Sequence, residues 1–182
     1  MKKIFFGSII LLLSAVAFIS CKKLLKNLLQ PFETTTGEIT MTIPTIPSSN
    51  ISGYLGSKTM YYNLDSTIKA KTGGSFGIND VSYVKIKSFN MTVLNGDADN
   101  NISNLQSLSI DISSNNNSTP QTLASTSIAD GTNNNLIIEV PSQPDILVYL
   151  KGTQIKYDFS GQIRRATTHP MDIAVVVTVI VK

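Results

Sequence analysis

The stretch MDIAVVVTVIV, residues 171–181, decides the fold of this chain. Valine and isoleucine are β-branched and favour strands, and apolar side chains occupy every position from Ile173 to Val177. A strand with one wet face would alternate apolar and polar residues, whereas a continuous apolar run is typical of a strand buried on both faces. We therefore expect residues 171–181 to form a central strand, covered on both sides, in the tightest part of the core.

Outward from this strand, apolar and polar residues alternate with a period of two along most of the chain. The pattern predicts further strands at residues 39–43, 60–64, 81–95, 108–113, 121–126, 136–140 and 155–164. In residues 81–95 the apolar phase changes between Ile86 and Phe89. Such a change indicates a β-bulge near Lys87 and Ser88, or a strand that passes from one sheet to the other.

Two short helices are expected between the strands. The first begins at the caps Asp65 and Ser66 and ends before Gly73. The second follows Ser142 and the early proline Pro144, runs over residues 146–150, and would cover one open end. Only 15% of residues are charged, and serine, threonine and asparagine fill the polar stretches. The sequence predicts an all-β, Greek-key or immunoglobulin-like β-sandwich of about seven to eight strands with one or two short helices.

The N-terminus has the features of an export signal. Lys2 and Lys3 precede an apolar run at residues 4–19, and the sole cysteine, Cys21, follows directly. The segment resembles the signal peptide of bacterial lipoproteins, although Phe18 and Ser20 stand where that pattern prefers leucine and glycine or alanine. The resemblance implies lipidation of Cys21, for example with palmitate. It also implies attachment to a membrane of the bacterial cell envelope, the outer membrane on its periplasmic or surface face.

Two alternatives to lipidation stay open. The small residues of Ala15-Val16-Ala17 suit the ordinary secretory peptidase, and a retained membrane helix would need about 20 apolar residues. The lipoprotein interpretation divides the chain into a signal peptide (1–20), a lipidated cysteine with a basic amphipathic tether (21–36) and a β-sandwich domain (37–182). The immunoglobulin likeness is architectural only, because the Cys–Trp–Cys signature is absent.

Charge argues against a nucleic-acid partner. The chain has 15 basic and 12 acidic residues, but residues 27–182 carry ten basic and twelve acidic ones, a net charge of −2. Binding to phosphate backbones needs a concentrated basic surface. The partners that we expect are the membrane, through the lipid anchor, and an envelope protein or glycan.

The sequence offers little catalytic chemistry. His169 is the only histidine, and without a second histidine or a cysteine partner a zinc site is not expected. Asp97 and Asp99 begin like a calcium loop, but Ile102 and Leu108 stand where an EF-hand has glycine and glutamate. An asparagine-rich hairpin turn at Asn95-Gly96 is the favoured alternative. We expect no cofactor, no metal and no enzymatic activity.

Four basic residues form the candidate binding site of the domain. Lys85 and Lys87 share one strand face, and Arg164 and Arg165 end another strand. If these strands pair, the four residues would form a small cationic patch for a carboxylate, a phosphate or an acidic partner. We expect a lipid-anchored envelope protein with a non-enzymatic binding or structural role. The alternative is a carrier of a small apolar ligand, held in a cavity between the sheets or under the 146–150 helix.

Overall fold

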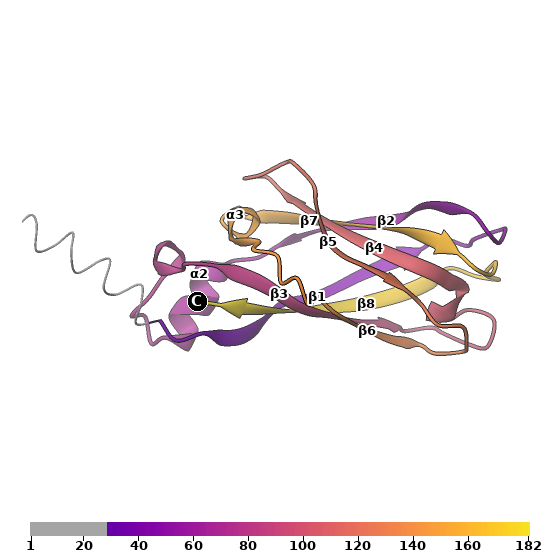
Figure 1. Cartoon of the computed structure of the whole chain (residues 1–182), viewed down its shortest axis with the longest axis horizontal. Coiled ribbons are helices and arrows are strands. Elements are labelled where there is room, and N and C mark those ends of the chain that lie inside the picture. Colours follow the sequence, from indigo (N-terminus) through magenta and orange to yellow (C-terminus); the bar gives the residue numbers. More distant parts are fainter. Residues whose placement is uncertain (1–28) are drawn as a thin grey trace, which may run out of the picture.

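Two antiparallel four-stranded sheets pack face to face in the structure, a computed structural model that describes residues 29–182 (Figure 1). Sheet A has the strand order β1-β8-β3-β6, and sheet B has the order β2-β7-β4-β5. The bounds are β1 (Phe32–Ile43), β2 (Ser52–Tyr61), β3 (Val84–Val93), β4 (Leu105–Ser114), β5 (Gln121–Ser127), β6 (Asn135–Glu139), β7 (Gln154–Ile163) and β8 (Met171–Val181). The predicted all-β Greek-key sandwich is confirmed. Within that class, the strand order is that of the jelly roll, which consists of two Greek keys.

Strand β8 is central, as its sequence predicts, because it pairs with β1 on one side and with β3 on the other. Its inward residues, from Ile173 to Val181 at alternate positions, are almost fully buried. The expectation that both faces are covered is wrong. Within residues 29–182 no third layer lies over sheet A, and Val176 and Ile180 on the outer face are only half-buried, between side chains of the flanking strands.

Most predicted strands are present, with one clear displacement. The expected bulge in β3 is confirmed by a shift of register between Ile86 and Ser88. The second strand, β2, ends at Tyr61 and not at residue 64, because Leu64 already begins a helix. This helix, α2 (Leu64–Lys71), is capped by Asn63, whose side chain accepts a hydrogen bond from the Ser66 backbone at 3.1 Å. The predicted caps, Asp65 and Ser66, therefore lie inside the helix.

The second predicted helix is also present and is shorter than expected. Helix α3 (Leu147–Leu150) forms one turn, and the Asp145 carboxylate accepts a hydrogen bond from the Leu147 backbone at 3.0 Å. Tyr149 and Leu150 are buried, so the turn covers the sandwich at one end, as predicted. Two 3₁₀ helices complete the elements, η1 (Ile78–Asp80) and η2 (Ile102–Asn104).

The folded part begins earlier than the predicted boundary at residue 37. Strand β1 starts at Phe32, inside the segment 21–36 that we assigned to the tether. Leu29 is 3% exposed and belongs to the core. Apolar side chains at these two positions pack on the domain, which is why the chain is already fixed there. The predicted signal peptide, Cys21 and the tether lysines lie outside the described residues.

The sandwich has two distinct ends (Figure 1). The chain enters β1 at the end that carries α2, and the C-terminus lies at this same end, because Phe32 and Val84 both stand opposite Val181. We call it the tether end. The opposite end, which we call the distal end, consists of the connections 44–51, 94–104, 128–134 and 164–170.

Val177 provides a test of the central position of β8. This side chain is 0% exposed and faces the interior. Val177→Asp would place an unpaired charge there, and we expect the free energy of unfolding to fall by about 3–5 kcal/mol. Since small domains have a total stability of about 5–15 kcal/mol, much of the variant should be unfolded in mild urea.

The control is the neighbouring substitution Thr178→Asp, which points to the half-buried outer face. We expect it to cost about 1 kcal/mol or less. Urea titrations followed by circular dichroism measure both variants. Equal stability of the two would contradict the inward orientation of Val177.

Candidate functional site

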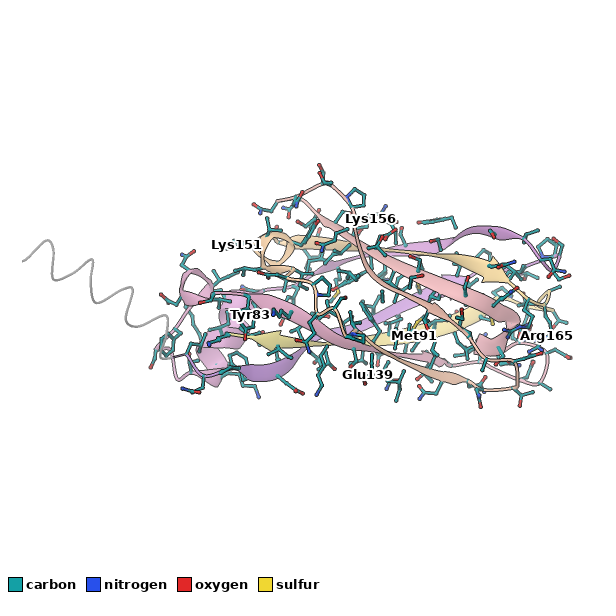
Figure 2. All side chains as sticks on the ribbon, in the orientation of Figure 1. Tyr83, Met91, Glu139, Lys151, Lys156 and Arg165 are labelled. Atoms are coloured by element: carbon teal, nitrogen blue, oxygen red, sulfur yellow. The ribbon has the colours of Figure 1, made fainter. Side chains whose placement is uncertain are left out.

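The four basic residues of the predicted patch do not come together. Lys85 and Lys87 lie on β3 in sheet A, whereas Arg164 and Arg165 follow β7 of sheet B. Strands β3 and β7 do not pair, so the condition for a single cationic patch fails. Figure 2 shows Tyr83, two residues before Lys85, near the tether end, and Arg165 at the distal end.

All four basic side chains have local partners. The Lys87 ammonium lies 2.7 Å from a Glu33 carboxylate oxygen, and the Lys85 ammonium lies 4.9 Å from the ring centroid of Tyr83. Arg164 donates to the backbone carbonyl of Ser103 at 2.9 Å and to that of Ile128. These contacts occupy the cations within the domain, and a free binding patch is not formed.

Arg165 likewise makes its contacts within the domain, with the 128–134 connection. Its guanidinium donates to the Asp130 carboxylate and, at 2.9 Å, to the Gly131 carbonyl. The hydrogen bond from Arg165 lowers the pKa of Asp130. The two arginines thereby fasten the end of β7 to the 128–134 connection.

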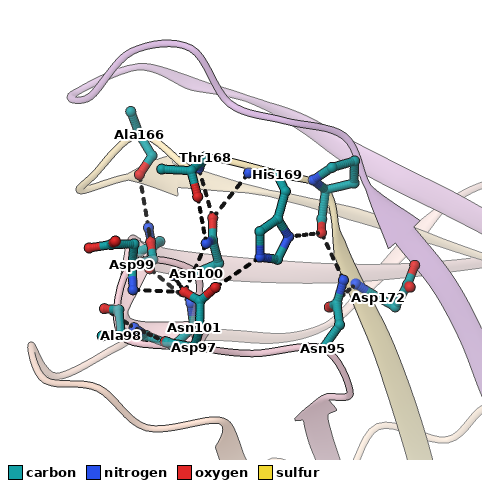
Figure 3. A network of polar contacts seen from close by, with 12 residues as sticks. Asn95, Asp97, Ala98, Asp99, Asn100, Asn101, Ala166, Thr168, His169 and Asp172 are labelled. Carbon is teal, nitrogen blue, oxygen red and sulfur yellow. Dashed lines mark hydrogen bonds and ion pairs between the residues drawn. The ribbon is translucent and has the colours of Figure 1, made fainter.

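A polar network further joins the distal connections 94–104 and 164–170 (Figure 3). One Asp97 carboxylate oxygen accepts hydrogen bonds from the Asp99 backbone and from the backbone and side chain of Asn100, each at 2.8 Å. The other oxygen lies 3.0 Å from Nε2 of His169. Asp97 is surrounded by hydrogen-bond donors, which is the environment of a capped turn and unlike a calcium site.

The geometry therefore favours a turn over a calcium loop at residues 95–101. The predicted hairpin turn does not account for the buried asparagines of this segment. Asn100 and Asn104 are 0% exposed, whereas a simple hairpin turn would leave them in solvent. The Asn100 side chain accepts a hydrogen bond from the Thr168 backbone at 2.7 Å, and that of Asn104 donates to the Ala166 carbonyl at 2.9 Å. No local sequence pattern indicates that these asparagines bond to a connection more than 60 residues away. Among residues 29–182 there is no group of three or more metal-ligating side chains.

His169 is held between two acceptors. Its Nδ1 lies 2.7 Å from the Pro170 carbonyl oxygen and its Nε2 faces the Asp97 carboxylate. Both nitrogens can donate only when the ring is protonated. The hydrogen bond to Pro170 and then that to Asp97 raise the pKa of His169, and the His169 bond lowers the pKa of Asp97 to about 2.

The pair makes stability depend on pH. The contribution of His169 is complete below its unfolded pKa of about 6.5 and is lost as the pH rises through the higher folded pKa. The contribution of Asp97 is complete above about pH 4 and is lost as the pH falls toward 2. The pair therefore stabilises the fold most between about pH 4 and 6.5.

We expect His169→Gln to lower the melting temperature at pH 5 and to have a smaller effect at pH 9, where the wild-type ring is neutral. Melting curves of both proteins across this range measure the difference. Because His169 is the only histidine, no other imidazole contributes. A difference that grows with pH would contradict the assignment.

A groove of about 670 Å³ lies in the distal half of the molecule, between the edge strands β1 and β2. We call it the Tyr54 groove. Its lining comes from both sheets and from the 94–104 connection, and comprises Thr40, Met41, Thr42, Pro44, Tyr54, Leu55, Gly56, Ser57, Lys58, Leu94, Asp172 and Ile173. The sequence gives only a weak signal for this groove, because its lining residues come from four separate segments.

A bulge in β2 shapes the groove. The register with β7 shifts between Tyr54 and Gly56, and Gly56 has a φ of +148°, which other residues rarely adopt. A Cβ atom at this position would lie 2.6 Å from the terminal methyl of Met41. Glycine therefore lets β2 approach β1 closely, and Tyr54 remains 65% exposed at the rim.

The groove combines apolar surface with both signs of charge. Tyr54 and Leu94 are 65% and 61% exposed. Lys58 comes from β2, and Asp172 from β8, where its carboxylate accepts a hydrogen bond from the Thr42 hydroxyl at 2.7 Å. Such a mixture of apolar contacts and a few polar groups is what small-molecule sites use.

The carrier alternative finds no support between the sheets. The interior is filled by large side chains that are at most 1% exposed, among them Phe89, Tyr157 and Phe159. A hollow of about 390 Å³ lies beside Leu150 at the tether end, between α2 and α3, and its lining is mainly apolar, with Tyr61, Tyr62, Leu64, Ile78 and Leu150. None of the described helices is both long and apolar enough to cross a bilayer.

Comparison with known proteins shows similarity of fold alone. No protein-family model and no curated protein matches the chain. The family 32 CBM, a carbohydrate-binding module, of NanJ from C. perfringens, solved in complex with galactose, is 10% identical, covers 81% of this chain and 99% of its own, and has a TM-score of 0.40. The STIV MCP is 11% identical over 83% of this chain and 41% of its own, with a TM-score of 0.40. The infectious bursal disease virus VP2 is 14% identical over 84% and 32%, with a TM-score of 0.34.

Proposed function

We propose that this chain is a lipid-anchored protein of the bacterial cell envelope that binds a partner and performs no chemistry. Acylated Cys21 holds it to the membrane, and the jelly roll carries the binding surface. The observation that supports this proposal best is the position of the groove relative to the chain entry. The described chain enters the sandwich at the tether end, and the groove lies in the distal half.

The geometry favours close tethering. Leu29 is buried in the domain, and only residues 22–28 separate it from Cys21. Fully extended, this stretch spans about 28 Å at most, since each residue adds about 3.5 Å. The tether end would then stand near the lipid headgroups, and the three lysines of this stretch, Lys22, Lys23 and Lys26, would meet anionic lipid.

The opposite end would point away from the membrane. Strand β1 has 12 residues and spans about 40 Å at about 3.4 Å per residue. The Tyr54 groove and the four distal connections lie in the half of the molecule that a partner reaches first. A rigid frame that presents loops and a groove in this way is typical of binding proteins.

Enzymatic function has less support. Among residues 29–182, His169 is fixed between Pro170 and Asp97, and both its nitrogens are occupied. Within this described range, no serine, threonine or tyrosine hydroxyl makes a hydrogen bond with its ring. A nucleophile activated by this histidine would need such a contact.

Lipidation is the part of the proposal with the sharpest test. We expect cells that express the full chain to incorporate a fatty-acid analogue into the wild type and not into Cys21→Ser, because the thiol is the acceptor. The matched control is Ser20→Ala, which places the preferred small residue before the cysteine and should keep the label. Gel fluorescence after metabolic labelling gives the result.

Equal labelling of Cys21→Ser and the wild type would contradict the anchor. So would a mature N-terminus at Phe18, which is the product of cleavage after Ala17. Fractionation of the labelled cells then distinguishes the outer membrane from the inner one.

A further inference from the structure

We propose that the Tyr54 groove binds an uncharged oligosaccharide. This inference rests on the proposed binding function and specifies its ligand class. It depends on three properties of the groove, which are its size, its exposed aromatic rim and its balanced charge.

The size suits a short sugar chain. Small-molecule sites have volumes of about 300–1,000 Å³, and the groove has about 670 Å³. It lies along the edge of the sandwich where β1 and β2 meet, and it is open to solvent. A closed pocket would instead admit a single small ligand.

Exposed apolar side chains are concentrated at the rim of the groove. Six large hydrophobic residues are at least 45% exposed in the described part of the chain, and three of them, Ile51, Tyr54 and Leu94, line the groove or the small hollow next to it. Scattered exposed residues are normal, whereas a gathered set marks a binding surface. The face of Tyr54 offers a flat apolar surface to the C–H groups of a sugar ring.

The polar groups favour an uncharged ligand. Lys58 and Asp172 line the groove from different sheets, and neither forms an ion pair within residues 29–182. Their charges cancel. Sugar hydroxyls both donate and accept hydrogen bonds, so one ligand can accept from the Lys58 ammonium and donate to the Asp172 carboxylate. The hydroxyls of Thr40, Thr42 and Ser57 add further partners of the same kind.

A folded protein partner fits this lining less well. The centre of a protein–protein interface is depleted in lysine, aspartate and serine, and covering Lys58 and Asp172 with a dry surface would leave charges unpaired at high cost. A hydrated sugar would leave the charged groups of Lys58 and Asp172 in contact with water. The observations therefore favour the glycan among the two envelope partners.

The surface next to Tyr54 would accept a longer chain. Tyr54 stands opposite Ser160, and the same row continues across sheet B through Ser109 and Ser125. The next row contains Ser57, Asp158, Asp111 and Thr122. Both rows lack aliphatic side chains, so the face beyond the groove is rich in hydroxyl and carboxylate groups.

The test uses the full chain in a detergent without a sugar headgroup and an array of immobilised oligosaccharides, with neutral hexamers of glucose and N-acetylglucosamine and an anionic alginate hexamer. We expect binding to at least one neutral hexamer and little binding to alginate. Tyr54→Ala should weaken binding at least tenfold, and Tyr54→Phe should stay within about threefold of the wild type, because the ring and not the hydroxyl carries the contact. Asp172→Asn should weaken it several-fold.

Tyr61→Ala is the matched control. Tyr61 is 75% exposed on the same strand, but at the tether end and outside the groove. Melting curves establish that each variant is folded. Unchanged binding by Tyr54→Ala, an equal loss in Tyr61→Ala, or no neutral hexamer bound by the wild type would overturn the inference.

These failures can be separated from failure of the proposed function. Crosslinking in intact envelopes that yields a Tyr54-independent, protease-sensitive adduct would reject the glycan and leave an anchored binding protein. Loss of lipid labelling at Cys21 would reject the anchor whatever the array shows.

Discussion

Every strand of sheet A depends on the two-sided pairing of β8. This last strand donates and accepts backbone hydrogen bonds with β1, the first strand, and with β3, so that Val181 stands opposite both Phe32 and Val84. Its inward valines fill the centre between the sheets, where they are buried at no more than 1% exposure. Sheet A therefore cannot be completed until the eleven residues of β8 are in place, and folding must close loops that span almost the whole domain. Such non-local pairing is slow compared with the folding of helical domains.

The distal end is held by a different kind of interaction, and the groove depends on it. Asn95 accepts a hydrogen bond from the Asp172 backbone at 2.8 Å and donates to the Pro170 carbonyl at 3.0 Å. The Leu94 backbone donates to the Asp172 carbonyl at 2.7 Å. Two groove residues, Leu94 and Asp172, are thus fixed to one another next to the His169–Asp97 pair (Figure 3). Side-chain hydrogen bonds order these connections before any ligand arrives, which lowers the entropy cost of binding.

Most of the fold could be predicted from the sequence and little of the candidate site, for physical reasons. Alternation of apolar and polar residues identifies a strand because successive side chains point to opposite faces of the sheet. The change of apolar phase near Lys87 also located the bulge in β3. The unbroken apolar run of β8 was misleading about its outer face, since Val176 and Ile180 are shielded by neighbouring strands, which no local pattern reveals. The sequence could not show that Lys85 and Arg164 belong to different sheets, because it does not reveal which strands pair. The groove lay beyond sequence reasoning, because its lining joins Thr42, Tyr54 and Asp172 from three strands.

The charge distribution fits the proposed orientation. The helices and connections of the tether end carry Lys69, Lys71, Lys151 and Lys182 against three aspartates, at 65, 80 and 145, whereas the distal connections and the start of β8 carry four aspartates, at 97, 99, 130 and 172, against two arginines. Screening limits the field of a charged membrane to about 8–10 Å at physiological salt, much less than the length of the sandwich. A surface of anionic lipid would therefore attract the lysines at the near end and leave the distal aspartates unaffected. The groove would then remain exposed to the partner even on a tether of a few residues, because the domain itself supplies the distance from the membrane.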